Sequence, residues 1–439
     1  MKALCIRPSV RDGPSHCSHG LGESLIGEMR PCETGYAAHG GRLWLMQRDY
    51  GLRTGWSSVL LVTTEVLWLI KGLGPGGAER LLVNAAATHD RKRFSFECAY
   101  VMPKKAHLVA ALENLGVRCH LLNGDGSAWR WPFALRRLVN EGRFKVVHCH
   151  SPLIAAVGRL VVRTIPARRR PVVVTTEHNA WSRFVWPTRW ANAITSPLDA
   201  ATIAVSEEVL SSIRGPARRR AVLLHHGIDI GAVRALRNER DAVRTEFGFT
   251  PSEFVVGTVA NFRPQKDYPT LLRAARRACD TLPTLRIVAV GQGPLADQIE
   301  RLRDELDLGD RVLLTGFRPD ATRVMAAFDA FTLASEYEGL PVALMEATAL
   351  GLPLVATSVG GAADFFTDGS TAVLVAVGDD KALADGWVQI ALDKPFRVQC
   401  ERGSATVSEQ FDAVRTTKAI EAIYERVLHD SDISKVGGR

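Results

Sequence analysis

Short apolar runs alternate with amphipathic stretches along most of the chain, beginning near residue 64. In the first half the apolar runs are EVLWLI, FECAYVM, VRCHLL, KVVHCH, PVVVTTEH and ATIAVS, at 65–70, 96–102, 117–122, 145–150, 171–178 and 201–206. Stretches with helical periodicity, such as GAERLLVNAAA, lie between them. Nearly continuous apolar strands that alternate with helices predict a parallel sheet covered on both faces.

The same alternation starts again after a polar stretch at 228–253. Its apolar runs lie at 254–261, 285–291, 311–316, 330–335, 353–358 and 371–377. The pattern therefore predicts an α/β protein with two doubly wound domains in tandem, at 61–228 and 229–410. Ligands of such open sheets bind beyond the carboxyl ends of the strands, so we expect the functional site in the cleft between the domains.

Residues 1–60 show neither a helical nor a strand periodicity of apolar residues, and they are rich in Gly, His, Ser and Cys. We expect them to be a poorly ordered leader outside the two domains, with Met46 as an alternative start. A zinc site from the nearby histidines and cysteines is a weaker reading than an incidental cluster, because their spacing fits no ligand template. These residues are His16, Cys17, His19 and Cys32.

The composition is that of a globular protein, with 46% hydrophobic and 23% charged residues over 439 positions. The best candidate for a membrane-spanning run, at 59–70, is too short and contains Glu65. Eight cysteines are scattered without a CxxC pair, which favours reduced thiols in the cytoplasm. We therefore expect a cytoplasmic protein without a transmembrane anchor.

Charge divides the chain. Residues 61–229 carry 24 Lys and Arg against 12 Asp and Glu, whereas residues 230–439 carry 24 against 30. The basic residues cluster at 91–93, 129–137, 167–170 and 217–220. These clusters have two open interpretations. They are either solvated loops or a surface attracted to anionic lipid head groups on the inner face of the plasma membrane. Trp129 and Trp131 suit an interfacial contact, and no nucleic-acid motif competes for this charge.

The first strand leads into KGLGPGGAERLL, in which Gly72, Gly74 and Gly77 match GxGxxG. A dinucleotide site needs an acidic residue at the end of the next strand, and that strand ends in AYVM. A phosphate or sugar beside Gly76 and Gly77, at the start of a helix, is the favoured interpretation. A simple tight turn is the alternative.

Two cations follow the first strand of the second domain in VANFRPQKDYPTLL (259–272). Arg263 and Lys266 lie in a loop that ends at the helix beginning near Pro269. Cations in a carboxyl-end loop suit a diphosphate, which Arg binds as a fork and Lys as a point charge. On these residues alone, two solvated loop cations are as good a reading.

The stretch SEYEGLPVALMEATALG (335–351) holds two glutamates of different kinds. Glu338 lies in a loop, whereas Glu346 lies in a helix predicted from Pro341 to Leu350 that is otherwise apolar on nearly every face. A buried carboxylate needs a partner, which is either a structural cation or the hydroxyls of a ligand. The amides of Gly339 and Leu340, before this helix, suit a phosphate.

The stretch EYEGLPVALMEATALGLPLVAT resembles the E-x7-E signature of the retaining glycosyltransferases of family 4, which have the GT-B fold. Supporting matches are GLGPGGAERLL, KVVHCHSP, TTEHN, IAVSEEV, HHGIDI, VANFRPQKDYPTLL, VGQGPLADQIERL and LTGFRPDATRVMAAFDAFTLAS, from about residue 64 to 427. The resemblance implies two Rossmann-like domains facing a cleft, an acceptor-side domain and a nucleotide-sugar-binding domain. We expect residues 411–439 to form a helix that packs back on the first domain, followed by a tail.

The resemblance also implies roles on the donor sugar. Glu346 binds the ribose hydroxyls of a nucleotide-sugar donor, and Glu338 contacts the sugar near its reacting face. His178, in TTEHN, lies near the anomeric centre. Gly76 and Gly77 line the donor phosphate and the acceptor side.

The resemblance further implies that Arg263 and Lys266 neutralise the diphosphate of the donor, assisted by the amides of Gly339 and Leu340. Asn261 is a departure, since the family often has Arg in GRL where this chain has ANF. A second departure is His226 in HGID, where the family has Asn. Both affect details of the donor contacts and leave the class unchanged.

The implied function is retaining transfer of a hexose from a UDP- or GDP-linked donor to a lipid-linked or polysaccharide acceptor in cell-envelope glycan synthesis. The resemblance implies no obligatory metal and no cofactor, and nucleic acid is not an expected partner. Three alternatives stay open: a nucleotide-sugar epimerase of the same fold, a glycoside hydrolase using Glu338 and Glu346, and a non-catalytic sugar-nucleotide-binding subunit.

Overall fold

The computed structural model describes residues 43–45, 57–59, 63–124, 126 and 129–437. The described residues divide into two units, one within residues 1–60 and the other within residues 61–439. In the first unit β1 (Leu43–Leu45) pairs antiparallel with β2 (Ser57–Val59). The proposed zinc ligands and Met46 lie outside the described residues.

The first sheet of the second unit has seven strands, all parallel, in the order β5-β4-β3-β6-β7-β8-β9. The six strands predicted from the sequence are present, and β9 is an additional edge strand of three residues. The bounds are β3 (Thr64–Ile70), β4 (Phe94–Tyr100), β5 (Arg118–Leu121), β6 (Val146–Cys149), β7 (Val172–Glu177), β8 (Ala201–Ala204) and β9 (Ala221–Leu223). We call this sheet and its helices the first domain.

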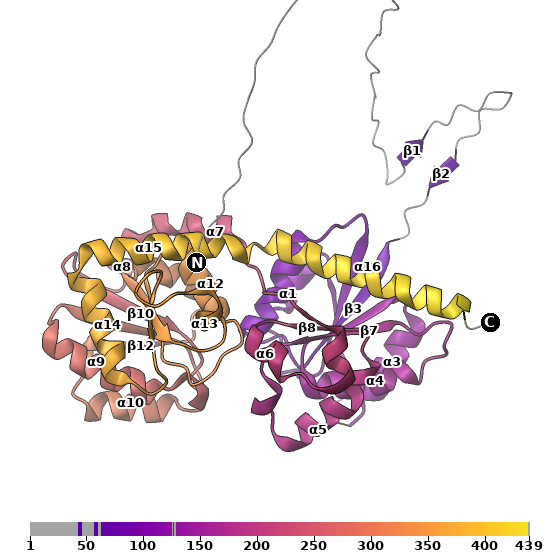
Figure 1. Cartoon of the computed structure of the whole chain (residues 1–439), viewed down its shortest axis with the longest axis horizontal. Coiled ribbons are helices and arrows are strands. Elements are labelled where there is room, and N and C mark those ends of the chain that lie inside the picture. The colour runs from indigo at the N-terminus through magenta and orange to yellow at the C-terminus, as the bar shows by residue number, and fades with distance from the viewer. Residues whose placement is uncertain (1–42, 46–56, 60–62, 125, 127–128, 438–439) are drawn as a thin grey trace, which may run out of the picture. The chain divides into compact units, whose positions relative to one another are not determined.

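Helices flank this sheet, as Figure 1 shows. They are α1 (Gly77–Thr88), α2 (Val109–Asn114), α3 (Trp131–Glu141), α4 (Pro152–Arg163), α5 (Trp186–Thr195) and α6 (Glu207–Ser212). Several begin with proline in the first turn, where its missing N–H costs nothing. The doubly wound architecture predicted for this half of the chain is confirmed.

The second sheet has six parallel strands in the order β12-β11-β10-β13-β14-β15. Its strands are β10 (Phe254–Val259), β11 (Leu285–Val290), β12 (Val312–Gly316), β13 (Ala330–Leu333), β14 (Leu354–Thr357) and β15 (Val373–Val375). The helices of this second domain are α7 (Ile230–Ala235), α8 (Arg240–Glu246), α9 (Tyr268–Thr281), α10 (Ala296–Glu305), α11 (Ala321–Val324), α12 (Val342–Ala349), α13 (Gly361–Phe365), α14 (Asp380–Leu392) and α15 (Lys394–Ser408).

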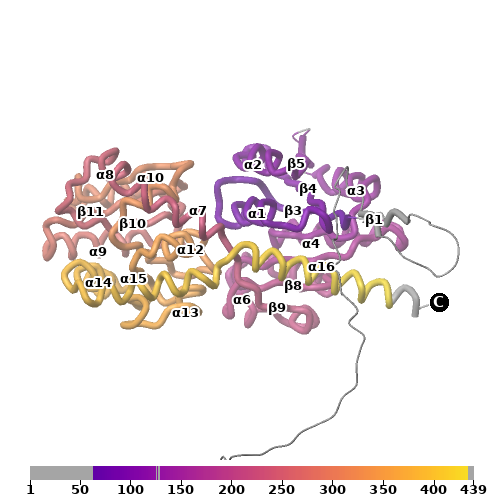
Figure 2. The backbone as a smooth tube through the Cα atoms, turned by 90° about the horizontal axis from the view of Figure 1, so that it is seen from above, coloured from indigo at the N-terminus to yellow at the C-terminus, as the bar shows by residue number. Residues whose placement is uncertain are grey.

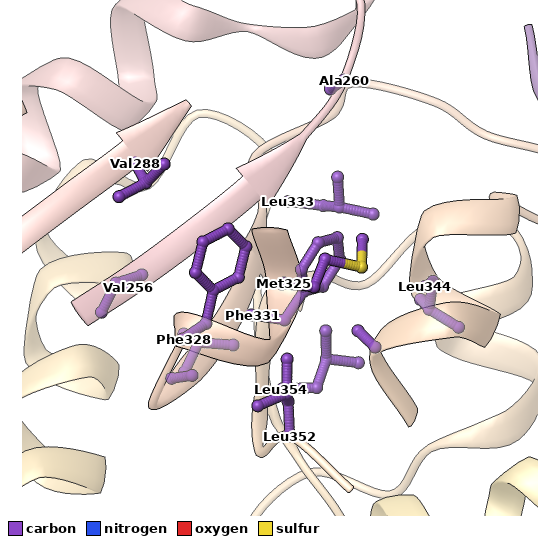
Figure 3. Close-up of a cluster of buried hydrophobic side chains, with 14 of the residues drawn as sticks. Val256, Ala260, Val288, Met325, Phe328, Phe331, Leu333, Leu344, Leu352 and Leu354 are labelled. Atoms are coloured by element: carbon purple, nitrogen blue, oxygen red, sulfur yellow. The ribbon is translucent and has the colours of Figure 1, made fainter. Parts of the chain in front are cut away.

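The core of the second domain explains why α12 is apolar on nearly every side. Phe328, Phe331 and Leu354 pack with side chains of the neighbouring strands, and Leu344 of α12 joins the same cluster (Figure 3). The β10 strand passes so close to Phe328 that a Cβ atom at Gly257 would lie 1.9 Å from the ring. A charge on a helix buried in this way is costly unless it has a partner, and Glu346 is the charged residue of α12.

The last helix, α16 (Ala413–Gly437), packs against α1 and β7 of the first domain, and Figure 2 shows it running alongside α1. Ile423, Tyr424 and Val427 of α16 are buried in a cluster with Trp68 and Phe96. In the part of the chain that the structure describes, no helix combines the length and apolar character needed to cross a bilayer.

Candidate functional site

The predicted site residues lie on loops at the carboxyl ends of strands in both domains. The first domain contributes the loop after β3, the beginning of α1 and the residue after β7. The second domain contributes the loops after β10, β13 and β14. Parallel strands direct these ends to one edge of each sheet, which is why residues so far apart in the sequence come together.

Glu346 is 7% exposed and connects the two domains. Thr322 Oγ1 donates a hydrogen bond of 2.9 Å to its Oε1, and Arg80 Nη1 from α1 lies 3.9 Å from the same oxygen. Burial raises the pKa of Glu346, while the charge of Arg80 and the Thr322 hydrogen bond lower it. The carboxylate therefore has one close hydrogen bond and one distant cation, which is little compensation for a buried charge.

Glu338 and Lys266 contact each other directly. Lys266 Nζ donates to Glu338 Oε1, and Ser335 Oγ donates to the same oxygen at 2.7 Å. Both side chains are largely buried. The cation predicted for a diphosphate and the carboxylate predicted for a sugar thus form one ion pair, an arrangement that the sequence did not reveal.

Arg263 is exposed at the end of the loop after β10, immediately before the short 3-10 helix η5 (Pro264–Lys266). Its charge acts on Glu79 in the first turn of α1 in the other domain. Burial raises the pKa of Glu79, and the backbone hydrogen bond, Lys105 and Arg263 lower it. Asn261 is exposed as well, and its carbonyl accepts a 2.8 Å hydrogen bond from the Arg263 N–H.

The beginnings of α1 and α12 approach each other. A Cβ atom at Gly77 would lie 3.1 Å from Val342 Cγ2 and 3.9 Å from the Val342 nitrogen. Helix N-termini carry partial positive charge, so this is a favourable position for an anion. The Glu79 carboxylate already occupies part of this position, beside the start of α1. A Cβ atom at Gly76 would lie 2.3 Å from Glu79 Oε2.

The loop that holds Glu338 is fixed by close backbone contacts on two sides. A Cβ atom at Gly339 would lie 2.2 Å from the carbonyl oxygen of His178. On the other side, the Gly361 N–H donates to the Gly339 carbonyl at 2.7 Å. Gly360, at φ +48°, has no side chain and so leaves room for the Glu338 carbonyl. A Cβ atom at Gly360 would lie 2.3 Å from that carbonyl oxygen. Leu340, which follows in the loop, is buried.

We expect Gly339→Ala to destabilise the protein and to lower activity, because the new methyl group forces the Glu338 loop away from His178. Overpacking of this kind costs about 1–3 kcal/mol of unfolding free energy. Urea unfolding measures this loss. The matched control is Gly231→Ala in α7, where the new Cβ would meet Asp229 Oδ1 at an ordinary 3.5 Å. Equal stabilities of the two variants would show that the close contact at Gly339 does not exist.

His178 belongs to a row of histidines at the strand ends of the first domain. His178 Nδ1 lies 3.2 Å from His226 Nε2, and the two rings stack at 5.0 Å. On the other side the His150 ring lies 6.0 Å from His178 and 4.1 Å from His148. His148 is hydrogen-bonded to Tyr424 of α16 at 2.7 Å and to Thr176 at 2.8 Å.

Burial keeps this row neutral at physiological pH. It lowers the pKa of His178 to about 4 and that of His148 to about 3. Burial also lowers the pKa values of His150 and His226, and the neighbouring histidines lower these two pKa values further. Among the described residues, His178 Nε2 is buried without a hydrogen-bond partner. Such an atom indicates a missing donor or acceptor, such as a ligand hydroxyl.

A small cavity of about 40 Å³ lies beside this row, between α1 and α16, and includes His148, His150 and Tyr424 in its lining. That volume accommodates a few water molecules. In the described part of the chain no three His, Cys, Asp or Glu side chains gather as they would around a metal ion.

The row predicts acid sensitivity. A histidine whose folded-state pKa lies below its unfolded value of about 6.5 is protonated first in the unfolded chain. Stability is therefore retained above pH 6.5 and falls as the pH drops toward the folded-state pKa, by up to about 1.4 kcal/mol per pH unit per histidine. We expect the free energy of unfolding of His226→Asn to depend less steeply on pH, between about pH 6.5 and 5, than that of the wild type. Urea titrations at several pH values measure both slopes; parallel curves would contradict the burial of His226.

Three residues of this site were missed by sequence reasoning. Arg80 lies on the other domain, Thr322 is an ordinary threonine in a helix, and Glu79 resembles a surface acid. A sequence signal existed for Arg80 and Glu79, because both follow the glycines of GGAER. His226 was noticed as a departure from the family, and its contact with His178 became visible only in the structure.

Comparisons with known proteins match both domains. The family model for glycosyltransferase family 4 matches residues 75–231, and that for glycosyl transferases group 1 matches residues 239–406. The chain belongs to the family 4 glycosyltransferases. The putative glycosyltransferase EpsF of Bacillus subtilis is 28% identical to this chain over 303 residues, which cover 66% of this chain and 78% of EpsF.

A second relative is the UDP-Gal:alpha-D-GlcNAc-diphosphoundecaprenol alpha-1,3-galactosyltransferase of Escherichia coli. It is 23% identical over 304 residues, which cover 66% of this chain and 78% of the relative. Among solved structures, Anabaena Alr3699/HepE in complex with UDP-glucose superposes with a TM-score of 0.74 at 21% identity, covering 82% of this chain and 99% of HepE. The GT-B glycosyltransferase fold predicted from the sequence is thereby confirmed.

Proposed function

We propose that this glycosyltransferase transfers a hexose, with retention of configuration, from a UDP-linked sugar to a lipid-linked or polysaccharide acceptor of the cell envelope. One observation carries the proposal. Two largely buried carboxylates, Glu338 in the loop before α12 and Glu346 within α12, each lie beside a cation, which is Lys266 for Glu338 and Arg80 of the first domain for Glu346. A buried carboxylate with as little compensation from protein groups as Glu346 is suited to bind ligand hydroxyls.

Glu346 is assigned to the ribose. It accepts one close hydrogen bond, from Thr322, and a carboxylate has capacity for several more. A ribose diol offers two hydroxyl donors to such an acceptor. Hydrogen bonds to a charged acceptor contribute about 1.5–3 kcal/mol each, enough to dominate the affinity for the nucleoside.

Lys266 and Arg263 are assigned to the diphosphate. Lys266 has three N–H donors, of which Glu338 engages one, so a phosphate oxygen can share the ammonium group. Arg263 is exposed beside it, and the beginnings of α1 and α12 add partial positive charge. Charge that develops on the departing diphosphate is stabilised by these groups, with contributions from the amides of Gly339 and Leu340.

Glu338 and His178 are assigned to the transferred sugar. The close approach of Gly339 to the His178 carbonyl brings the two residues to neighbouring positions from different domains. His178 is neutral, and its Nε2 is one of the buried atoms that have no hydrogen-bond partner among the described residues. Departure and attack on one face of the sugar, the retaining course, needs no carboxylate nucleophile. Asn261, Gly76 and Gly77 complete the proposed donor surroundings.

The choice of donor and acceptor class rests on similar proteins. HepE was solved with UDP-glucose, and the Escherichia coli relative is named for a UDP-sugar donor and a diphosphoundecaprenol acceptor. The contacts of Glu338 with Lys266 and Ser335 disfavour the hydrolase alternative, because a hydrolase needs both carboxylates free to act on the glycosidic bond. We expect transfer to persist in EDTA, since the proposal assigns the diphosphate to protein cations.

Thermal shift with UDP-, GDP- and ADP-sugars tests the donor. A donor at one hundred times its Kd stabilises the folded protein by about 2.7 kcal/mol, and we expect this for the UDP-sugars. NMR of the product then reports the anomeric configuration. Stabilisation by no nucleotide-sugar would contradict donor binding. Conversion of the donor to its epimer without an acceptor would favour the epimerase, and binding without turnover would favour the non-catalytic subunit.

A further inference from the structure

Helix α5 has its polar and apolar sides reversed. Its two buried side chains are Asn192 and Thr195. Its large apolar side chains face solvent, with Trp186, Trp190 and Ile194 exposed by 74%, 63% and 71%. These three follow a spacing of four residues and therefore form one stripe along the helix. A helix of a soluble protein normally buries such a stripe, so this one requires an explanation.

The orientation of α5 is fixed by a buried polar network. Arg159 of α4 is inaccessible to solvent and donates from Nη1 to Asn192 Oδ1 and Thr195 Oγ1, while Nη2 donates to Asp199 Oδ2 at 2.7 Å. Asn192 Nδ2 donates to Glu177 Oε1 at 2.6 Å. Turning α5 over would take the Asn192 and Thr195 hydrogen bonds away from the buried Arg159 and Glu177, which is destabilising even though Arg159 keeps its pair with Asp199. The stripe is therefore held outward.

The neighbouring helices continue this surface. α4 packs against α5 on one side and against α3 on the other, as their positions in Figure 1 also indicate. Exposed apolar and basic side chains occur on all three helices and on the residues just before α3 and α5. We call this surface the α3–α5 face; it comprises Trp129, Phe133, Leu153, Leu160, Val185, Trp186, Trp190 and Ile194, with Arg136, Arg137, Arg163 and Arg189.

The charge of this region is predominantly positive, although Arg137 pairs with Glu141 and the buried Arg159 pairs with Asp199. From residue 129 to residue 198 the chain has 12 Lys and Arg but only Glu141 and Glu177 as acids, and Glu177 is buried. A second copy of the chain is a poor partner for this face, because two such surfaces repel each other. Aliphatic side chains beside tryptophans suit a hydrocarbon boundary better than stacking against nucleotide bases.

We propose that the α3–α5 face docks on an anionic phospholipid bilayer, with the α5 stripe inserted at the level of the head groups and the surrounding arginines on lipid phosphates. Tryptophan in this position, with arginine beside it, is typical of interfacial membrane contacts. The proposal follows the lipid interpretation for the basic cluster at 129–137 and adds α5, which the sequence analysis did not single out.

The face borders the candidate site. The short 3-10 helix η1 (Trp181–Arg183) lies just before α5, and the Arg183 guanidinium is 4.5 Å from the centre of the Tyr337 ring. Tyr337 immediately precedes Glu338. A lipid-linked acceptor in the bilayer would therefore reach the protein next to the loop of Glu338. This last step rests on the proposed function, whereas bilayer docking does not.

Vesicle co-sedimentation of the full chain tests the proposal. We expect binding to phosphatidylcholine vesicles that contain phosphatidylglycerol to exceed binding to pure phosphatidylcholine by at least about tenfold at low salt, and to weaken as salt is added. The triple variant Trp186→Ser, Trp190→Ser, Ile194→Ser should lose about tenfold or more in partitioning. Leu392→Ser, which changes an exposed apolar residue of the second domain, should bind as the wild type does.

A charge reversal separates the two contributions. Arg189→Glu should weaken binding to the anionic vesicles, and the same reversal at Arg301, an exposed residue of α10, should have a smaller effect. The proposal is overturned if the triple variant sediments like the wild type, if the wild type ignores anionic vesicles, or if the stripe mediates a dimer or oligonucleotide binding instead. Thermal shift with UDP-glucose, retained in the triple variant, distinguishes a failure of docking from a failure of donor binding.

Discussion

Glu346→Gln is expected to abolish most donor binding without destabilising the protein. The amide retains an acceptor for Thr322 but removes a carboxylate whose pKa burial raises, so the folded state no longer carries that buried charge. Loss of charged hydrogen bonds to the ribose, at about 1.5–3 kcal/mol, raises the Kd for UDP by roughly 10- to 150-fold. Calorimetric titration with UDP measures the affinity, and urea unfolding measures the stability.

The matched control for this change is Glu336→Gln. Glu336 lies in the loop of Glu338 but is exposed, so its neutralisation should change neither UDP affinity nor stability appreciably. The assignment of Glu346 fails if its glutamine variant binds UDP as the wild type does. A variant that loses both UDP binding and several kcal/mol of stability would indicate a structural role for the Glu346 carboxylate instead.

Lys266→Ala is expected to impair both stability and transfer. It leaves the Glu338 carboxylate largely buried without its cation, and removal of one partner of a buried pair costs about 3–5 kcal/mol. Transfer should fall by about 10²- to 10³-fold, the usual effect of removing one group that stabilises charge in the transition state. Urea unfolding and the rate of donor turnover at saturating UDP-sugar measure the two effects.

Two further variants separate the two effects of Lys266→Ala. Lys266→Ala combined with Glu338→Gln should recover much of the stability, since no unpaired charge remains, but should stay inactive. Arg263→Ala should lower transfer while leaving stability nearly unchanged, because Arg263 is exposed. An active double variant, or an Arg263→Ala enzyme with normal turnover, would contradict the assignment of these cations to the diphosphate.

The fold was largely predictable because each strand is an apolar run long enough to be distinct from its flanking helices. The exception is β9, an apolar run of three residues that follows an arginine-rich turn at the edge of the sheet and is too short to stand out as a strand. The burial of Glu346 was predictable for the same reason, since the remainder of α12 is apolar.

What the sequence could not reveal is which polar groups meet. Arg80 and Glu346 are separated by 266 positions and belong to different domains, and the pairing of Lys266 with Glu338 depends on side-chain directions in two loops. The reversed polarity of α5 was equally hidden. Asn192 and Thr195 look like surface residues until Arg159, on another helix, is placed between them.

The central claim is that one donor is bound by residues of both domains, with Glu346 on the ribose. A crystal structure of the full chain with UDP bound tests it most directly. The account predicts ribose hydroxyls within hydrogen-bond distance of the Glu346 carboxylate, with the diphosphate beside Arg263 and Lys266. A ribose that contacts other residues, with Glu346 still bound only to Thr322 and Arg80, would contradict it.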